Sequence, residues 1–381
     1  MSDSGIARPI AAEKIDLDAM VADLRELVEI ESPSRDPDAL TASGSALAAM
    51  IERHLGGRCE LVDSEAGPHV HWQGGVEPAV LLLGHHDTVF PVGTLDNRPF
   101  QVVDGLATGP GVYDMLGGIV QALHGLALAP QSVRRHVEIL FSADEEVGST
   151  TSRELIEERA MACGAVLVLE PSGPGGTLKT GRKGCGTFWV DVAGRAAHAG
   201  LEPENGVNAL VEAAHQVLAI AALARPEVGT TVTPTVSSAG TTDNVVPAAA
   251  SIVVDVRVES AKEKDRVEAA MATLTAVDPA ATITVHGAVS RPPMPESASA
   301  ALFPLAEAVG DDISGVAVGG GSDGNFTAAI GVPTLDGLGA VGGGAHADTE
   351  HVVIETMPAR AALVANLVAA IVSDASGTPL T

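Results

Sequence analysis

The chain has 381 residues, of which 46% are hydrophobic and 19% are charged, and this composition is that of an ordinary globular protein. The length favours two or three domains over a single core. The net charge of −27 argues against a nucleic-acid surface, which needs clustered Lys and Arg side chains.

Nothing in the sequence indicates export or membrane insertion. Residues 1–5 lack a basic segment followed by an apolar run, and the apolar stretch 361–372 is interrupted by Asn366 and too short to span a bilayer. The three cysteines, Cys59, Cys163 and Cys185, are far apart and have no C-x-x-C spacing. We therefore expect a cytoplasmic protein with buried, inert thiols and no membrane partner.

The first part of the chain alternates helices with strands. Apolar residues at three- and four-residue spacings predict two helices within residues 16–55, separated by a break at 32–34. Strands are predicted at 59–63, 69–73, 79–84, 136–142 and 165–170, and helices at 119–128 and 152–160. This alternation predicts an α/β fold, with a mainly parallel sheet covered by helices on both faces.

The pattern changes after residues 171–186, a stretch rich in Gly and Pro that predicts a linker. Strands at 187–192, 230–238, 250–258 and 281–286, with helices at 205–222 and 262–274, then follow in the order β-α-β-β-α-β, which is typical of ferredoxin-like α+β domains. After about residue 292 the chain returns to helix and strand. We therefore expect a first domain formed by 1–183 and 293–381, interrupted by a smaller domain at 184–292.

Side chains that can bind metals stand where strands of the first domain end. His85 and Asp87 follow the apolar run 80–83, and in extended backbone both point the same way, so Asp87 is placed to hold the second nitrogen of the His85 ring. Glu145 and Glu146 follow the strand at 136–142, where two adjacent acids are costly unless they are used. We expect one of them to bind a metal while the other acts as a general base.

Two imidazoles and three carboxylates are available in all. This set is sufficient for two zinc ions when one carboxylate bridges them, and such a pair can activate water and polarise the carbonyl of an amide. The five residues are His85, Asp114, Glu146, Glu170 and His346. Four other histidines have no partner apparent from the sequence and are expected to be structural, namely His71, His124, His136 and His351. His351 is the main rival of His346, which is preferred because it lies in a glycine-rich turn.

Several motifs together resemble the M20 family of metallopeptidases and aminoacylases, most closely its glutamate carboxypeptidase-like branch. They extend over essentially the whole chain: GHHDTV (84–89), GPGVYDMLGG (109–118), SADEEVGS (142–149), LEPS (169–172), GRAAHAG (194–200), NVVP (244–247), GGGSDGN (319–325) and GGGAHAD (342–348). One departure is Leu116, where many relatives have Lys; it is not a ligand position.

The resemblance implies a role for each site residue. His85, Asp114 and Glu170 would bind one zinc ion, and the bridging Asp114 with Glu146 and His346 would bind the second, with Co²⁺ or Mn²⁺ as alternatives to zinc. Glu145 would be the general base and acid, and Asp87 would support His85. In a homodimer, His198 of the smaller domain would reach the partner's active site and stabilise the oxyanion. Asn244 and Arg257 would bind the substrate's carboxylate or position its neighbours. Arg291, where the chain returns to the first domain, is another candidate for that carboxylate, because a guanidinium can grip it through two hydrogen bonds.

The function that follows is hydrolysis of a small peptide or N-acyl amino acid with a free carboxylate. Two branches stay open within this class, a carboxypeptidase and a biosynthetic-type deacetylase or aminoacylase. A rival from a different class is a non-catalytic, metal-binding protein that keeps the fold. A change at Glu145 or at a ligand would have indicated that rival, and all of these residues are present.

Overall fold

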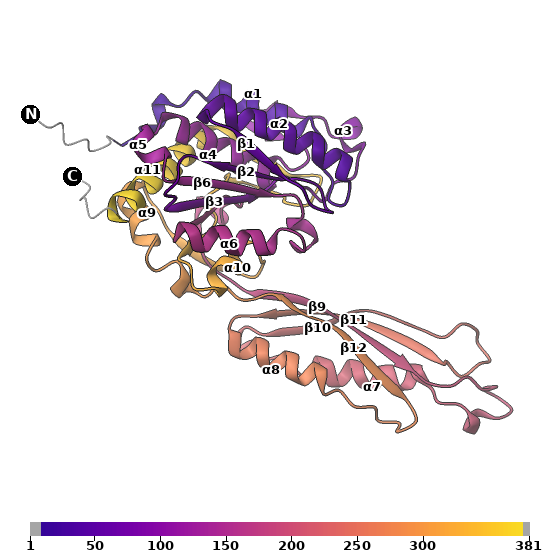
Figure 1. The fold of residues 1–381 in the computed structure, drawn as a ribbon. Coiled ribbons are helices and arrows are strands. Elements are labelled where there is room, and N and C mark those ends of the chain that lie inside the picture. Colours follow the sequence, from indigo (N-terminus) through magenta and orange to yellow (C-terminus); the bar gives the residue numbers. More distant parts are fainter. Residues whose placement is uncertain (1–8, 376–381) are drawn as a thin grey trace, which may run out of the picture. The chain divides into compact units, whose positions relative to one another are not determined.

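The computed structural model describes residues 9–375, and the chain divides into two compact units (Figure 1). The large unit contains the chain up to Gly181, Glu296–Val318 and the chain from Ser322 onward, and the small unit contains Arg182–Pro295 with Gly319–Gly321. Residues 1–5, from which the sequence predicted the lack of a signal peptide, lie outside the described residues.

A six-stranded sheet forms the centre of the large unit, in the order β1-β2-β6-β3-β7-β14. Strands β6, β3, β7 and β14 run parallel, whereas β1 and β2 join one edge in antiparallel pairing. The predicted α/β class with a mainly parallel sheet is therefore confirmed, with an antiparallel edge in addition. The strands are β1 (Cys59–Val62), β2 (His69–Gln73), β3 (Val80–His85), β6 (Val137–Ser142), β7 (Val166–Val168) and β14 (Thr334–Leu335).

Both faces of this sheet are buried because successive side chains of each strand enter different cores. In β3, Val80 and Leu82 belong to the core shared with helices α1, α2, α4 and α11, whereas Leu81 and Leu83 belong to a core shared with α6. The α10 helix packs on α6, β7 and β14. The helices are α1 (Leu17–Val28), α2 (Pro37–Leu55), α4 (Gly117–Leu128), α6 (Arg153–Cys163), α10 (Gly324–Ala329) and α11 (Met357–Ala375).

The stretch 171–186 contains a boundary between the two units, after Gly181, but it is built of strands and is not the irregular linker that its glycine and proline content predicted. Residues Leu178–Arg182 form β8, which pairs with β13 (Gly315–Val318), and β9 begins at Gly184. At Gly186, a Cβ would lie 2.1 Å from the Ala288 carbonyl oxygen, so glycine serves close strand packing here.

Further short elements complete the large unit. The sequence did not predict a four-stranded sheet in the order β15-β16-β5-β4, which consists of β15 (Gly342–Gly343), β16 (His351–Val353), β5 (Leu106–Thr108) and β4 (Gln101–Val103). Its strands are only two or three residues long, below the length at which alternation is detectable. The short helices are α3 (Thr94–Asn97), α5 (Gln131–Arg134) and α9 (Phe303–Val309).

The small unit is an antiparallel sheet with two helices, in the predicted β-α-β-β-α-β order. Its sheet has the order β10-β11-β9-β12 and leaves β10 as an edge strand. This is the ferredoxin-like arrangement. The elements are β9 (Gly184–Ala193), α7 (Ala209–Ala221), β10 (Thr231–Ala239), β11 (Ala249–Val258), α8 (Ala261–Ala272) and β12 (Thr282–Arg291).

The long apolar helix at the end of the large unit is a core helix. The helix Ile354–Asp374 is long and apolar enough to cross a membrane, but 61% of its apolar 18-residue segment is buried within the protein. Ala361, Val364 and Leu367 are fully buried, and α11 packs along α4. Burial against other helices accounts for its apolar character.

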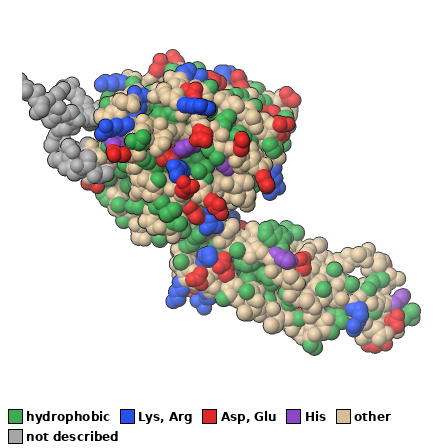
Figure 2. Space-filling model, in the orientation of Figure 1, with side chains coloured by type: hydrophobic (Ala, Val, Ile, Leu, Met, Phe, Trp, Pro, Cys, Tyr) green, Lys and Arg blue, Asp and Glu red, His purple; other side chains and the backbone are tan. Residues whose placement is uncertain are grey.

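Charged side chains of both signs are interspersed on the surface. On the face shown in Figure 2, Lys and Arg side chains are scattered among Asp and Glu side chains over the large unit. All three cysteines are free thiols. Burial raises the pKa of Cys59 to about 12, and burial also raises the pKa of Cys163, so both stay protonated at neutral pH.

Candidate metal centre

Acids and a histidine lie at the carboxyl ends of three neighbouring parallel strands of the large sheet. Strand β3 ends at His85, β6 is followed by Glu145 and Glu146, and β7 is followed by Glu170. Because β6, β3 and β7 are adjacent and parallel, their carboxyl ends lie side by side at the same end of the sheet. All the ligand groups described below lie within the large unit.

A first cluster contains His85, Asp114 and Glu170. The His85 Nε2 atom lies 3.4 Å from Asp114 Oδ1 and 3.6 Å from Glu170 Oε1. Ligand atoms around a tetrahedral zinc ion lie about 3.3 Å from one another. His85 Nε2 and Asp114 Oδ1 are both buried, and neither makes a hydrogen bond of good geometry, although the two atoms face each other at 3.4 Å. Buried polar atoms without partners are costly, so this arrangement fits a cation that supplies the missing interaction.

A second cluster contains Asp114, Glu146 and His346. His346 Nε2 lies 3.2 Å from Asp114 Oδ2 and 3.0 Å from Glu146 Oε1. The two oxygens of Asp114 therefore face different clusters, as a bridging carboxylate requires. His346 has φ 62° in the glycine-rich turn, a strained backbone conformation of the kind found at functional sites. Its rival His351 lies in β16, where its Nδ1 is 2.9 Å from the Thr349 carbonyl oxygen.

The imidazoles and carboxylates strongly perturb one another's pKa values. Hydrogen bonds with Asp114 and Glu146 raise the pKa of His346 to about 10. For His85, burial opposes protonation, but contacts with Asp114 and other carboxylates outweigh it and raise the pKa well above its usual value. The pKa of Asp114 is lowered, because its histidine contacts outweigh burial. The buried carboxylates of the two clusters lie close together, and their negative charge is stabilised either by protons on the histidines or by metal cations that replace those protons.

The ring of His85 is oriented through Asp87, although not mainly through its carboxylate. His85 Nδ1 lies 2.9 Å from the Asp87 backbone carbonyl oxygen and 3.4 Å from Oδ1. The Asp87 carboxylate instead accepts hydrogen bonds from the backbone N–H groups of Glu145 and Glu146 at 3.1 and 3.2 Å, and from the Ser34 hydroxyl at 2.7 Å. Asp87 thus positions both the histidine and the acidic pair.

The acidic pair does not continue in extended backbone as the sequence suggested. Glu145 and Glu146 begin a one-turn 3₁₀ helix, Glu145–Val147, directly after Asp144. Glu146 reaches His346, whereas Glu145 is buried and its charge acts on His85. The two acids are therefore distinct in position, but through a helical turn and not through strand alternation.

A buried acid that the sequence analysis missed holds the Asp114 loop. Glu350 is fully buried, and its carboxylate accepts backbone N–H groups of Gly111, Tyr113 and Asp114 at 3.1, 3.0 and 2.9 Å. Burial raises its pKa to about 7 despite these hydrogen bonds. In the sequence, the only indication of this role is that Glu350 is an acid four residues after His346, next to the glycine-rich segment.

Replacing Glu350 with Gln is expected to weaken metal binding. Because the amide has one acceptor oxygen instead of two, part of the Asp114 loop loses its support, and the Kd for Zn²⁺ should rise about 10–100-fold, the usual effect of removing a residue that supports a ligand. Competition with a chromophoric chelator measures this Kd, and Glu355→Gln, at an exposed glutamate nearby, is the control. An unchanged Kd in a folded Glu350→Gln protein would contradict the positioning role.

The helix after Asp114 is fixed by backbone contact. A Cβ at Gly118 would lie 2.2 Å from the Leu169 carbonyl oxygen, directly before Glu170. Glycine is required at such a close approach. The first turn of α4 therefore lies against the segment that carries Glu170.

The predicted residues of the small unit form two groups, and the first contains His198 and Asn244. The Ala199 N–H donates to the Asn244 carbonyl oxygen at 2.9 Å, so the segments that carry the two residues are paired. His198 is exposed, and its Nδ1 accepts the N–H groups of Gly200 and Leu201 at 3.1 and 3.2 Å. These contacts leave its Nε2 as the remaining proton carrier.

The second group contains Arg257 and Arg291. Both are paired in register with Cys185, from the strands on either side of β9. Arg257 makes two hydrogen bonds with Asp255, at 2.9 and 3.1 Å, and Arg291 is buried. The backbones of the two arginines are therefore paired with the beginning of β9, whereas His198 follows its end.

Comparisons with known proteins show which family the chain belongs to. The family model described as Peptidase family M20/M25/M40 matches residues 81–370. Carboxypeptidase G2 from Pseudomonas sp. (strain RS-16) is 34% identical over 373 residues, which cover 92% of this chain and 88% of that protein. Succinyl-diaminopimelate desuccinylase from Rhodospirillum rubrum is 35% identical over 191 residues, 43% of this chain and 47% of that protein.

Solved structures share the fold. Aminopeptidase PepT from Bacillus cereus superposes with a TM-score of 0.77 at 22% identity, over 94% of this chain and 99% of that one. The YXEP protein of Bacillus subtilis, described as a dinuclear metal-binding M20 peptidase, gives a TM-score of 0.66 at 16% identity, over 94% and 98%. The chain belongs to peptidase family M20 and is an enzyme of the peptidase and amidohydrolase class that this family comprises.

Proposed function

We propose that this protein is a dinuclear zinc hydrolase that cleaves the amide bond of a small peptide or N-acyl amino acid with a free carboxylate. The observation that carries the proposal is the pair of ligand clusters that share Asp114, with the buried His85 Nε2 lying 3.4 Å and 3.6 Å from two carboxylates and making no hydrogen bond of good geometry.

The residues present fit two divalent cations. His85, Asp114 and Glu170 would hold one, and Asp114, Glu146 and His346 would hold the other. Bound there, such cations lower the pKa of water and polarise a carbonyl oxygen. Nitrogen and oxygen donors in this ratio suit zinc, and Co²⁺ or Mn²⁺ are the alternatives.

Glu145 would move the proton. It is buried at the carboxyl edge of the sheet beside a ligand, and the Asp87 carboxylate fixes its backbone N–H. A carboxylate in this position takes a proton from the attacking water and later gives it to the leaving amine nitrogen. The neighbouring Glu146 is engaged with His346 and is not available for this task.

Arg257 and Arg291 would bind the substrate's carboxylate. Guanidinium groups grip carboxylates through two parallel hydrogen bonds, and these two arginines flank the same residue of β9. Because Arg257 Nε and Nη2 already donate to Asp255, its part in binding would require the substrate's carboxylate to displace Asp255. Asn244 would position neighbouring substrate groups.

The layout of the small unit favours a role for His198 in a partner subunit. Cys185, between the two arginines, and Ala193, where the His198 loop begins, are eight residues apart on one strand, roughly 26 Å at the rise of a β-strand. A small substrate cannot span that length. If His198 and the arginines serve one reaction, they therefore come from different chains, and His198 Nε2 would stabilise the oxyanion of the partner's substrate.

An exposed apolar surface of the small unit supports a homodimer. The edge strand β10 exposes Val236 by 60%, and α7 beside it exposes Leu210 by 52% and Leu218 by 71%. Unprotected edge strands with apolar neighbours pair readily with another chain. We infer that a second copy of this chain covers β10 and α7.

Among the open branches, we favour a carboxypeptidase. Carboxypeptidase G2 is similar over nearly the whole chain, whereas the desuccinylases are similar over about half of it. A deacetylase or aminoacylase is the second candidate. We also propose a cytoplasmic location, in keeping with three free thiols.

A substrate panel tests the proposed function. The protein purified with zinc should release amine from at least one N-acyl amino acid or dipeptide with a free carboxylate, and the matching amide-capped substrate should be cleaved far more slowly. Chelation should abolish the rate and zinc should restore it. Zinc bound with no turnover across the panel would instead favour a non-catalytic, metal-binding protein.

A further inference from the structure

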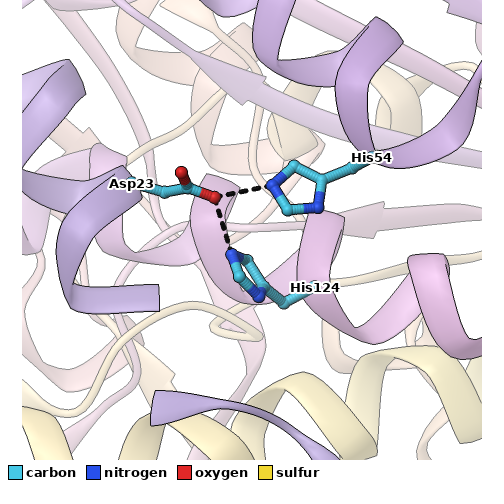
Figure 3. A group of neighbouring side chains, drawn as sticks. All are labelled: Asp23, His54 and His124. Atoms are coloured by element: carbon cyan, nitrogen blue, oxygen red, sulfur yellow. Dashed lines mark hydrogen bonds and ion pairs between the residues drawn. The ribbon is translucent and has the colours of Figure 1, made fainter. Parts of the chain in front are cut away.

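A second group of metal-ligating side chains lies outside the centre described above. Asp23 of α1, His54 of α2 and His124 of α4 point toward one another from three helices (Figure 3). Asp23 Oδ2 lies 2.6 Å from His54 Nε2 and 2.8 Å from His124 Nε2. The proposed hydrolysis uses none of these residues.

We propose that Asp23, His54 and His124 form a separate zinc site that cross-links the three helices. One carboxylate oxygen and two imidazole nitrogens are the donors that zinc prefers, and three protein ligands leave a fourth position for water. The three donor atoms lie within 4.8 Å of one another, as in the two clusters around Asp114, and these are the three such groups within residues 9–375.

The burial of the group suits an ion that enters from solvent. Side-chain exposure is 14% for Asp23, 17% for His54 and 9% for His124, so the three side chains are largely shielded but not sealed from solvent. A shielded carboxylate interacts more strongly with a cation than one in water.

The Asp23 carboxylate is held in place by Arg53, which binds the oxygen that does not face the histidines. Arg53 Nη2 lies 2.8 Å from Asp23 Oδ1, so Oδ2 is directed at the two histidines. Arg53 is itself paired with Glu26 at 3.0 Å, and the acid offsets its charge. Polar contacts that orient a ligand in this way are typical of metal sites.

Zinc would replace hydrogen bonds that now join the donors. Around a tetrahedral ion the donor atoms would lie about 3.3 Å apart, so the two contacts of Asp23 Oδ2, at 2.6 and 2.8 Å, would open by about 0.7 and 0.5 Å. Each imidazole would carry its proton on Nδ1 and present Nε2 to the metal. Small rotations of three side chains suffice, because the donors already converge on one point.

The site is distant from the hydrolytic centre along α4. His124 is seven residues beyond Gly117, the first residue of the helix, which corresponds to roughly 10 Å. An ion there would hold α1 and α2 against α4, and it would stabilise the folded protein without contact with substrate.

Zinc stoichiometry tests the site on the full-length protein. After equilibration with buffered zinc and removal of free metal, His54→Gln and His124→Gln should each bind one ion per chain fewer than the wild type, with hydrolytic activity retained. His286→Gln, at an exposed histidine of the small unit, is the control and should lose none. Zinc should also raise the Tm of the wild type more than that of His54→Gln.

Cobalt gives a second measurement, whose first readout comes from the wild type alone and whose comparison uses the His54→Gln variant. Titration of the metal-free wild type should show one further equivalent of Co²⁺ with the visible absorption of a tetrahedral site, and the His54→Gln protein should lack it. Equal zinc content in the wild type and His54→Gln, with identical cobalt titrations, would overturn the proposal and leave a hydrogen-bonded cluster only. Because the test is a difference in bound metal, its failure is distinguishable from inactivity of the hydrolytic centre.

Discussion

Replacing Glu145 with Gln is expected to lower kcat for amide hydrolysis by about 10²–10⁴-fold, the usual contribution of a general base. Gln keeps the size and the hydrogen-bonding oxygen of the side chain but cannot accept and return a proton. The backbone N–H contact with Asp87 does not depend on the side chain, so the local turn should persist. The rate is measured by amine release, with zinc content determined on the same sample.

Replacing the adjacent acid, Glu146, is expected to have a different effect from replacing Glu145. Glu146→Gln removes a ligand from the second cluster, so it should lower metal content as well as rate. Glu154→Gln, at an exposed glutamate of α6, should change neither. Near-normal kcat for Glu145→Gln would remove this residue as the base, and loss of zinc from that variant would assign it a ligand role instead.

Mixing two inactive variants is expected to restore about a quarter of the wild-type activity. His198→Ala supplies an intact Glu145, and Glu145→Ala supplies an intact His198. If His198 acts across the dimer, each mixed dimer has one complete active site out of two, and random exchange makes half of the dimers mixed. The activity per chain after subunit exchange is the measurement.

The same experiment separates the alternatives. If His198 acted within its own chain, no combination would contain a complete site, and the mixture would stay as inactive as its parents. Leu218→Asp, on the exposed face of α7, supplies a further control, because it should give a monomer that binds zinc but turns over poorly. A fully active monomer would contradict the assignment of His198 to a partner subunit.

The sequence predicted the mainly parallel sheet of the large unit and the position of His85, Glu145 and Glu170 after the ends of its strands. The runs ending at His85 and before Glu145 are apolar without alternation, which indicates strands buried on both faces. The parallel arrangement then brings their carboxyl ends together. Asp114 and His346 lie in glycine-rich turns, where only the combination with the strand-end residues, and the family resemblance, indicated a role.

Other features depend on packing that a linear pattern does not contain. His124 was expected to have no partner, yet the packing of α1 and α2 against α4 places Asp23 and His54 around it. Glu350 was missed because its partners are backbone N–H groups of a loop more than 230 residues earlier. The glycine content of 171–186 does not reveal the strand at Leu178–Arg182, because glycine marks both turns and close strand contacts.

The tight contact at Gly118 bears on how metals are exchanged. Since the main chain on both sides of this contact leaves no room for even a methyl group, the spacing between Asp114 and Glu170 is set by the scaffold and not by the ion. Removing the metals should therefore leave the backbone of the cavity in place, ready to be refilled. One cation could then be exchanged for another, including a coloured or magnetic probe, without refolding the protein.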